Sequence, residues 1–145
     1  MKDMNENSTA DNTARLTGLL RDHGLRPTRQ RMALASLLID TAARHVTADQ
    51  MRREIAELGI TMSLATIYNT LNQFTRVGLL REINPDGEVA YFDTNTERHH
   101  HFYDQTTGKL TDIPANSINI SSLPNPPAGK RIERVDVFIR LSGDS

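Results

Sequence analysis

The chain has 145 residues and no cysteine. This absence excludes disulfide bonds, thiolate zinc sites, iron–sulfur clusters and cysteine nucleophiles. Long apolar runs are also missing, so no segment is predicted to span a membrane, and the first dozen residues are too polar for a signal peptide. We therefore expect a soluble, cytoplasmic protein with no membrane partner.

Lysine is missing from the stretch between Arg15 and Arg81, which nevertheless carries ten arginines and five acids, a net charge of +5. Residues 1–14 carry −2 and residues 82–145 carry −4, so the overall charge of −1 hides an asymmetry. A basic half joined to an acidic half predicts one part that binds a polyanion and another with a different task.

The first part of the chain has helical periodicity. Residues 1–12 lack it and are predicted to be a disordered tail. Four helical segments are expected after the tail, within residues 13–24, 26–42, 46–60 and 63–80. Residues typical of helix N-caps and C-terminal ends bound them: Thr28, Thr47 and Ser63 at the starts, and Gly24, Gly59 and Gly78 at the ends.

The pattern then changes to β-structure. "LLREINPDGEVAYF" and "HHHFYDQTTGKLTDI" each predict a hairpin, with turns at "NPDG" and "TTG". A short helix near Ser117–Ser122 and a final strand in "RIERVDVFIRLS" complete the chain. The predicted fold class is α+β, with an N-terminal winged helix-turn-helix in residues 13–93 and a small α/β domain in residues 94–145.

The fourth helix has two distinct faces. Leu64, Ile67, Leu71 and Phe74 form an apolar stripe, and the opposite face presents Ala65, Asn69, Asn72, Gln73 and Arg76. Amide and guanidinium groups suit base edges in the DNA major groove. Any amphipathic helix has a polar outer face, but the helix order, the hairpin and the charge asymmetry together favour DNA binding. Nearby arginines are expected to contact phosphates: Arg26, Arg29, Arg31, Arg52 and Arg53.

Three consecutive histidines stand out among the five in the chain. On a strand, His99 and His101 share one face and His100 takes the other. The shared face offers two ligands for a divalent metal or for haem iron. Further ligand candidates are His45, Asp93, Glu97, Asp104 and Asp112. The alternative is a strand whose histidines form hydrogen bonds or titrate near neutral pH.

From about Leu16 to Leu141 the chain resembles the ferric uptake regulator family, most clearly in "GLRPTRQRMALASLL", "HVTADQM" and "SLATIYNTLNQF". The resemblance implies a homodimer with a C-terminal dimerisation domain and an AT-rich inverted repeat as operator. It also implies that Tyr68 contacts a base, beside Asn69 where the family often has arginine. The expected DNA-binding residues are Arg26, Arg29, Arg31, Ser63, Ala65, Thr66, Tyr68, Asn69 and Arg76.

The same resemblance implies a regulatory ion, iron, manganese or zinc, held by His45, Asp93, His99, His101 and Asp112. Two family features are absent. "DQTT" stands in place of the first cysteine pair, and Asn119 and Val135 occupy expected ligand positions of a second site. A cysteine-free member with "HHHFYDQTTG" resembles the haem-responsive iron response regulators of alphaproteobacteria. That likeness implies haem, free or from a delivering protein, bound by His99, His100 and His101.

We expect a regulator of iron and haem homeostasis rather than an enzyme, and three other interpretations remain. A metal-activated or peroxide-sensing repressor would keep the family and change the signal. A zinc-dependent hydrolase would use His45, Asp93, His99 and His101 around a metal-bound water, but no further acid–base group is evident. A haem carrier would bind haem without binding DNA.

Overall fold

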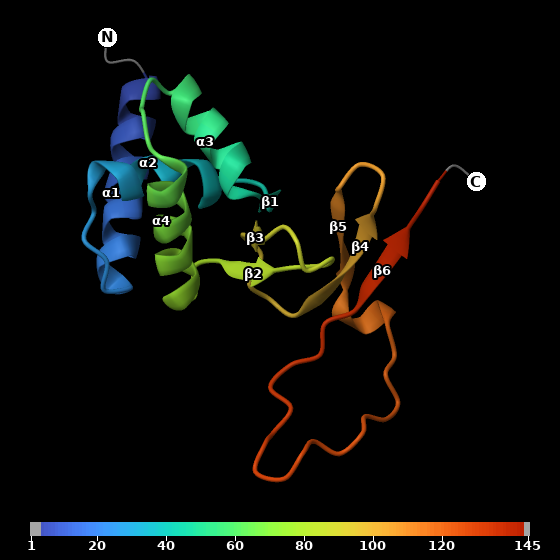
Figure 1. Cartoon of the computed structure of the whole chain (residues 1–145). Helices are drawn as coiled ribbons and strands as arrows, with labels where there is room; N and C mark the ends of the chain where they lie inside the picture. The colour runs from blue at the N-terminus through green and yellow to red at the C-terminus, as the bar shows by residue number, and fades with distance from the viewer. Residues whose placement is uncertain (1–3, 144–145) are drawn as a thin grey trace. The chain divides into compact units, whose positions relative to one another are not determined.

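The computed structural model describes residues 4–143 and contains mainly helices in its first half and strands in its second (Figure 1). The chain divides into two compact units after Thr96, whereas the sequence placed the division after Asp93. The elements are α1 (Met4–Asp22), α2 (Arg29–Leu38), β1 (His45–Val46), α3 (Ala48–Glu57), α4 (Leu64–Arg76), β2 (Arg81–Ile83), β3 (Tyr91–Asp93), β4 (His99–Asp104), β5 (Leu110–Pro114), a 3-10 turn (Ala115–Ser117) and β6 (Phe138–Leu141).

Helix α1 begins at Met4, so the expected disordered tail is wrong for residues 4–12, and residues 1–3 lie outside the described part. No glycine or proline precedes Gly18. Leu16 and Leu20 are buried and anchor the second half of α1 in the core. Because nucleation is the costly step of helix formation, extending an anchored helix toward its N-terminus requires only favourable propagation.

The predicted N-caps are confirmed. The hydroxyl oxygens of Thr28, Thr47 and Ser63 each accept a hydrogen bond from the backbone N–H three residues on, at 3.2, 3.1 and 3.1 Å. These bonds satisfy N–H groups that have no partner within the helix. The expected C-terminal glycines adopt left-handed φ angles after their helices: Gly24, Gly59 and Gly78.

The core of the N-terminal unit lies among the four helices and the first hairpin, and includes Phe92. Ile67, Leu71 and Phe74 of α4 are fully buried, as predicted, but Leu64 is 47% exposed and does not belong to the core. A helical wheel gives the direction of a side chain and not its depth along the axis. Leu64 is the first residue of α4, at the end of the helix.

A small antiparallel sheet with strand order β1-β3-β2 follows the helices. Strands β2 and β3 form the predicted hairpin around "NPDG". Strand β1 was not predicted, because two residues are too short to show periodicity. It pairs with β3 so that His45 stands opposite Asp93.

The C-terminal unit contains a second sheet, with order β5-β4-β6. Strands β4 and β5 form the second predicted hairpin, and β6 runs parallel to β4. The helix expected near Ser117–Ser122 is wrong: only the 3-10 turn Ala115–Ser117 forms, in a segment rich in isoleucine, asparagine and serine, which favour a helix poorly. The final strand is confined to Phe138–Leu141, because only these residues pair with β4.

The predicted α+β fold class, with an N-terminal helix-turn-helix and a small second domain, is confirmed. No helix within residues 4–143 combines the length and apolarity that crossing a membrane requires.

Candidate metal centre and nucleic-acid interface

The register of β1 and β3 brings His45 and Asp93 together in the N-terminal unit. His45 Nε2 lies 3.3 Å from Asp93 Oδ2, and the Asp93 side chain is fully buried. Its other oxygen, Oδ1, accepts a hydrogen bond from the backbone N–H of Asn95 at 2.9 Å. A buried carboxylate requires a nearby positive charge. Arg81 of β2 also stands opposite Asp93 in the sheet, and a metal ion bound by both His45 and Asp93 would add a further positive charge.

Arg44 holds β1 in this position. Its guanidinium donates two hydrogen bonds to the Glu54 carboxylate of α3, at 2.9 and 2.7 Å, and one to the Leu37 carbonyl at 3.2 Å. These bonds lower the pKa of Glu54. The backbone N–H of Arg44 donates to the Thr94 hydroxyl at 2.9 Å, and its carbonyl accepts from the Thr94 N–H at 3.1 Å. The position of His45 is thus tied to α2, α3 and the residue after Asp93.

A second group of candidate ligands lies on the hairpin of the C-terminal unit. Asp112 of β5 stands opposite His101 of β4. Its Oδ1 lies 3.3 Å from His99 Nε2 and 3.6 Å from His101 Nε2, and the two imidazole rings are 4.5 Å apart between centroids. His101 is fully buried, and its ring stacks on Phe138. Strand alternation therefore places both histidines on one face, as predicted.

A backbone contact fixes the ring of His99 with its Nε2 toward Asp112. Its Nδ1 lies 2.6 Å from the Glu97 carbonyl oxygen. A carbonyl only accepts, so Nδ1 carries a proton, and in the neutral ring the lone pair on Nε2 is directed toward Asp112. A lone pair facing a carboxylate is repelled unless a proton or a metal ion lies between them. A backbone partner on the outer nitrogen is also the usual support of a metal-binding histidine. The imidazole and carboxylate donors fit manganese, iron or zinc.

His100 points to the opposite face, as predicted, and has a different role. Its Nδ1 accepts a hydrogen bond from the backbone N–H of Val137 at 3.1 Å, so the proton of the neutral ring is on Nε2. Burial lowers its pKa, and positive charge on His101, Arg98 and His99 lowers it further. A neutral ring with Nδ1 occupied and Nε2 protonated does not fit the role of an iron ligand in this arrangement.

Two other candidate ligands have structural roles. Glu97 supplies the carbonyl that fixes His99. Asp104 ends β4, and its carboxylate accepts hydrogen bonds from the backbone N–H groups of Thr106 and Thr107 at 2.9 and 3.3 Å. These bonds lower its pKa and stabilise the turn into β5. Sequence proximity to the histidines did not separate Asp104 from Asp112, whereas the strand register does.

Helix α4 presents the predicted polar face to solvent. Ala65, Asn69 and Arg76 are exposed. Tyr68 is 39% exposed, and its ring meets Phe92 edge to face at 5.8 Å between centroids. The hydroxyl of Ser63 caps the helix and also donates to Thr66 Oγ1 at 2.9 Å.

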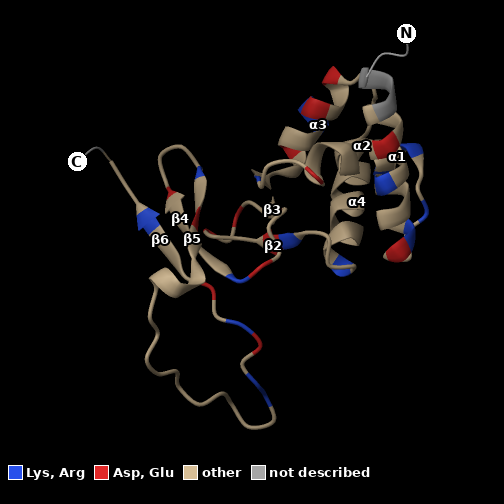
Figure 2. Ribbon diagram, turned by 180° about the vertical axis from the view of Figure 1, so that it is seen from behind, with Lys and Arg blue, Asp and Glu red and all other residues tan. Residues whose placement is uncertain are grey.

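The arginines around this face differ in their surroundings. Arg26 and Arg29 are exposed, and the ribbon of Figure 2 is coloured for Lys and Arg in the connection between α1 and α2. Arg52 and Arg53 of α3 lie 2.8 and 3.8 Å from the Asp49 carboxylate, which offsets part of their charge. Arg52 lowers the pKa of Asp49.

Arg31 is half-buried and contacts Gln73 of α4, a pairing that the sequence did not indicate. The two residues are far apart in the chain and belong to helices with separate periodicities. No local pattern could have predicted their contact.

These features define a class of protein: a helix-turn-helix with a basic exposed face, joined to a β-unit with histidine and carboxylate ligands. The model of the ferric uptake regulator family matches residues 22–127, and the chain belongs to that family. Members of this family are dimeric, DNA-binding transcription regulators rather than enzymes, and the family includes metal-sensing and peroxide-sensing proteins.

Individual relatives agree with this assignment. Over 100 residues the chain is 34% identical to the peroxide-responsive repressor PerR of Staphylococcus aureus strain Mu50, covering 69% of this chain and 67% of the relative. The manganese-containing ferric uptake regulator of Pseudomonas aeruginosa superposes with a TM-score of 0.68 at 23% identity, covering 90% of this chain and 98% of the other. The iron-containing regulator of Francisella tularensis gives 0.64 at 21% identity, covering 83% and 92%.

Proposed function

We propose that one divalent ion, held jointly by His45, Asp93, His99, His101 and Asp112, controls the affinity of this regulator for double-stranded DNA. The supporting observation is that strand register brings His45 close to Asp93 and, separately, His99 and His101 close to Asp112. Two ligands in one unit and three in the other are each too few for a closed protein site, whereas five suffice for manganese, iron or zinc.

The ion would act by fixing the position of its ligands. Its positive charge would hold the His45–Asp93 pair and the β4–β5 ligands together, and so restrict the relative orientation of the two units. In a homodimer that orientation sets the spacing between two recognition helices, and hence the fit to an inverted-repeat operator. Tyr68, Asn69, Ala65 and Thr66 would face bases in each half-site, with Ser63 capping the helix. Arg26, Arg29 and Arg76 would neutralise phosphates.

Within this proposal, haem is the second effector, as in the iron response regulator branch. The cysteine-free chain and its three consecutive histidines support this choice. Haem iron bound by His99 and His101 would compete for the ligands of the divalent ion and favour the conformer with low DNA affinity. His100 could bind the haem iron only after giving up its hydrogen bond from the Val137 N–H. We therefore expect it to contribute less to haem binding than His99 and His101.

Fluorescence anisotropy tests both effectors. Metal-stripped protein is titrated with an AT-rich inverted-repeat duplex, first with manganese and then with haemin. We expect haemin to abolish DNA binding by the wild type and to have no effect on the DNA binding that the His99→Ala/His101→Ala variant retains. We also expect the variant to bind manganese on the order of 100-fold more weakly or worse.

The matched control is His23→Ala, because His23 follows α1, contacts the Leu19 carbonyl through its Nδ1 and belongs to neither ligand group. DNA binding that needs manganese and ignores haemin would reject the haem proposal and leave a metal-activated repressor. Equal manganese binding by the wild type and the double variant would reject the metal site itself.

A second candidate function is peroxide sensing, favoured by the 34% identity to a peroxide-responsive repressor. Without cysteine, oxidation would occur at a histidine beside bound iron. The test is iron loading followed by dilute peroxide, with mass spectrometry of the digested protein. Addition of one oxygen atom to His45, His99 or His101, together with loss of DNA binding, would support this function. Unmodified histidines with unchanged DNA binding would exclude it.

A further inference from the structure

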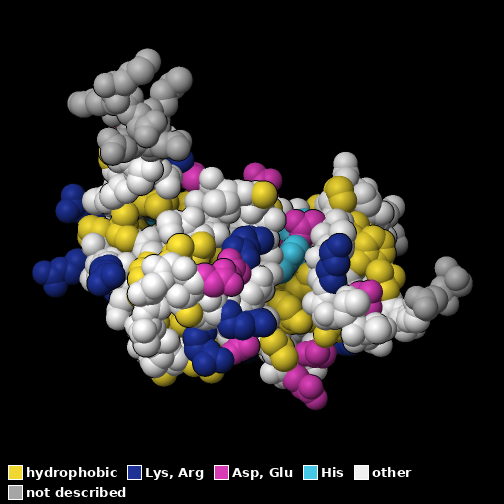
Figure 3. Space-filling view, turned by 90° about the horizontal axis from the view of Figure 1, so that it is seen from above, with side chains coloured by type: hydrophobic (Ala, Val, Ile, Leu, Met, Phe, Trp, Pro, Cys, Tyr) yellow, Lys and Arg dark blue, Asp and Glu magenta, His cyan; other side chains and the backbone are white. Residues whose placement is uncertain are grey.

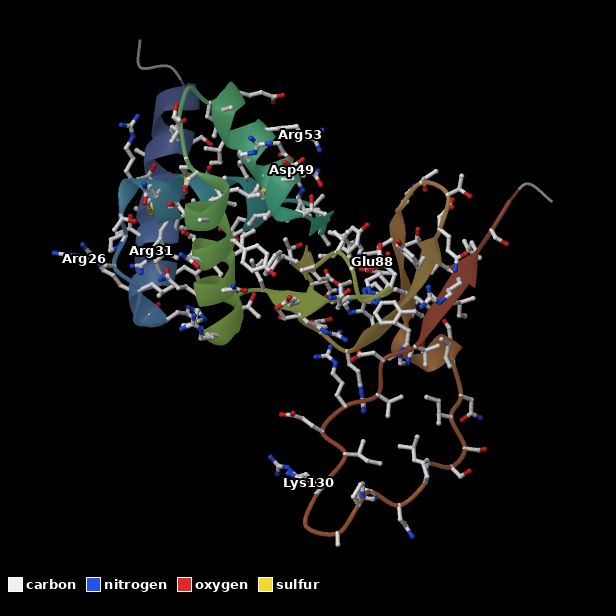
Figure 4. The ribbon with its side chains drawn as sticks, viewed as in Figure 1. Arg26, Arg31, Asp49, Arg53, Glu88 and Lys130 are labelled. Carbon is white, nitrogen blue, oxygen red and sulfur yellow. The ribbon has the colours of Figure 1, made fainter. Side chains whose placement is uncertain are left out.

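Arg31 connects the start of α2 to the middle of α4. Its Nε and Nη2 groups both donate to Oε1 of Gln73, at 3.2 and 3.0 Å, and its Nη1 donates to the Arg26 carbonyl at 2.9 Å. Because a guanidinium only donates hydrogen bonds, the atom that Gln73 turns toward it must be the amide oxygen. The side chain of Gln73 is therefore fixed in one of its two amide orientations. Figure 4 shows Arg26 extending outward before α2, with Arg31 nearer to α4.

This orientation restricts what Gln73 can recognise. A free glutamine binds adenine with two hydrogen bonds, accepting from N6 through its oxygen and donating to N7 through its NH₂ group. Here two donors of Arg31 already contact that oxygen and hold it toward α2, which leaves the NH₂ group as the part of the amide directed to a ligand. Among major-groove edges it matches the acceptors of guanine (O6 and N7) and thymine (O4). It can also donate to adenine N7, but it cannot accept from the adjacent adenine N6 or from cytosine N4, so adenine loses one of its two hydrogen bonds.

Gln73 also lies where an incoming base edge has room. It stands one helical turn after Asn69 on the same face of α4. Both line a surface hollow of about 230 Å³, with Thr28 and Arg31 on the α2 side and Thr66 and Thr70 on α4. The hollow is part of the face through which the helix would enter the groove.

We propose that Gln73 is a specificity-determining residue that Arg31 holds as a hydrogen-bond donor for a guanine or thymine acceptor, and that Arg31 is a positioning residue rather than a phosphate contact. The inference rests on the proposed DNA-binding function. It assigns to Arg31 a role different from that of exposed Arg29, two residues earlier on the same helix.

The test begins with selection of binding sites by the metal-loaded wild-type protein from a random-sequence duplex library. Affinity is then measured for every single-base change in the selected half-site. We expect the protein to bind most tightly when one position of the half-site is guanine or thymine. Gln73→Ala should reduce the ratio of affinities between the preferred and the other bases at that position by about tenfold. Arg31→Lys keeps the charge but breaks the two-donor contact, so the freed amide should gain affinity for adenine at the same position. Circular dichroism checks that each variant is folded.

A double-mutant cycle separates positioning from direct contact. In the Gln73→Ala background, Arg31→Lys should leave the base preference unchanged. Arg29→Gln is the matched control and should weaken binding to all sequences alike, with a shallower dependence on salt.

Two results overturn the inference while leaving the proposed function intact. One is a base preference that Arg31→Lys does not alter. The other is an equal loss of affinity for all sequences in Gln73→Ala, which would indicate that Gln73 contacts the DNA backbone. A wild-type protein that selects no sequence at all would instead reject the proposed function.

Discussion

The two units bury different kinds of side chain. The N-terminal unit has one apolar cluster to which all four helices and the first hairpin contribute. In the C-terminal unit, the buried side chains within the described residues are three histidines and only three large apolar groups: His99, His100, His101, Tyr103, Leu110 and Ile113. The first unit is stabilised mainly by apolar burial, whereas half of the buried side chains of the second are polar histidines.

The surface of the C-terminal unit strengthens this contrast. Large apolar side chains of this unit are about 40–50% exposed: Ile120, Leu123, Ile132, Ile139 and Leu141. Figure 3 shows hydrophobic groups at the surface near the C-terminal end of the chain. In a family of dimers, a second copy is the natural cover for such a surface. We therefore expect this unit to gain stability from both a partner and an ion, and the helical unit to need neither.

Truncation of the apolar core should produce the largest effect and confine it to one unit. Phe74→Ala removes a fully buried ring from α4 and should lower the free energy of unfolding by about 3–5 kcal/mol. Segment-resolved hydrogen exchange should show faster exchange in α2, α3 and α4, with β4 and β5 unchanged. Arg76→Ala, at an exposed position of the same helix, should change stability by less than about 0.5 kcal/mol. Equal loss of protection in both units would mean that they unfold together.

Metal addition should have the next largest effect, mainly on the second unit. At a free concentration 100 times the dissociation constant, an ion bound only by the folded protein adds about 2.7 kcal/mol. We expect manganese to slow hydrogen exchange in β4 and β5 most strongly. His45 belongs to the N-terminal unit. If one ion is shared by both ligand groups, His45→Ala should nevertheless reduce the protection that manganese gives to β4 and β5. If manganese protects β4 and β5 equally in His45→Ala, the ion belongs to the C-terminal ligands only.

The sequence predicted those features of the fold that depend on local chemistry. The hydroxyls of Thr28, Thr47 and Ser63 cap helices because each needs only its own first turn. The alternation of His99, His100 and His101 follows from the two-residue period of a strand, so their faces were predictable without knowing what they contact.

Features that depend on contacts distant in the chain were not predictable in the same way. Spacing alone leaves Asp104 and Asp112 equally plausible as ligands. The family resemblance named Asp112, and the pairing of β4 with β5 places it opposite His101. The family resemblance named His45 and Asp93, but the two-residue strand that pairs them has no periodic signal. The contact of Arg31 with Gln73 joins two helices and was likewise missed.

The smallest predicted effect concerns Glu54, whose bond to Arg44 links α3 to β1. Arg44 lowers the pKa of Glu54 in the folded state, so this interaction stabilises the protein above the unfolded-state pKa of about 4.3 and is lost as the pH falls through the lower folded-state pKa. The side chains are 27% and 25% exposed, and solvent screening limits the contribution to below about 1 kcal/mol. Glu54→Gln should therefore be less stable than the wild type at neutral pH.

The difference in stability between the wild type and Glu54→Gln should become smaller as acid protonates Glu54 in the wild type. Urea unfolding of the N-terminal unit, followed from pH 7 down through this range, measures it, with Glu57→Gln as an exposed control on the same helix. If the unfolding free energies of the wild type and Glu54→Gln differ by the same amount at every pH, the charge on Glu54 does not stabilise β1. The Leu37 carbonyl and the Thr94 backbone would then be sufficient to hold His45 against Asp93.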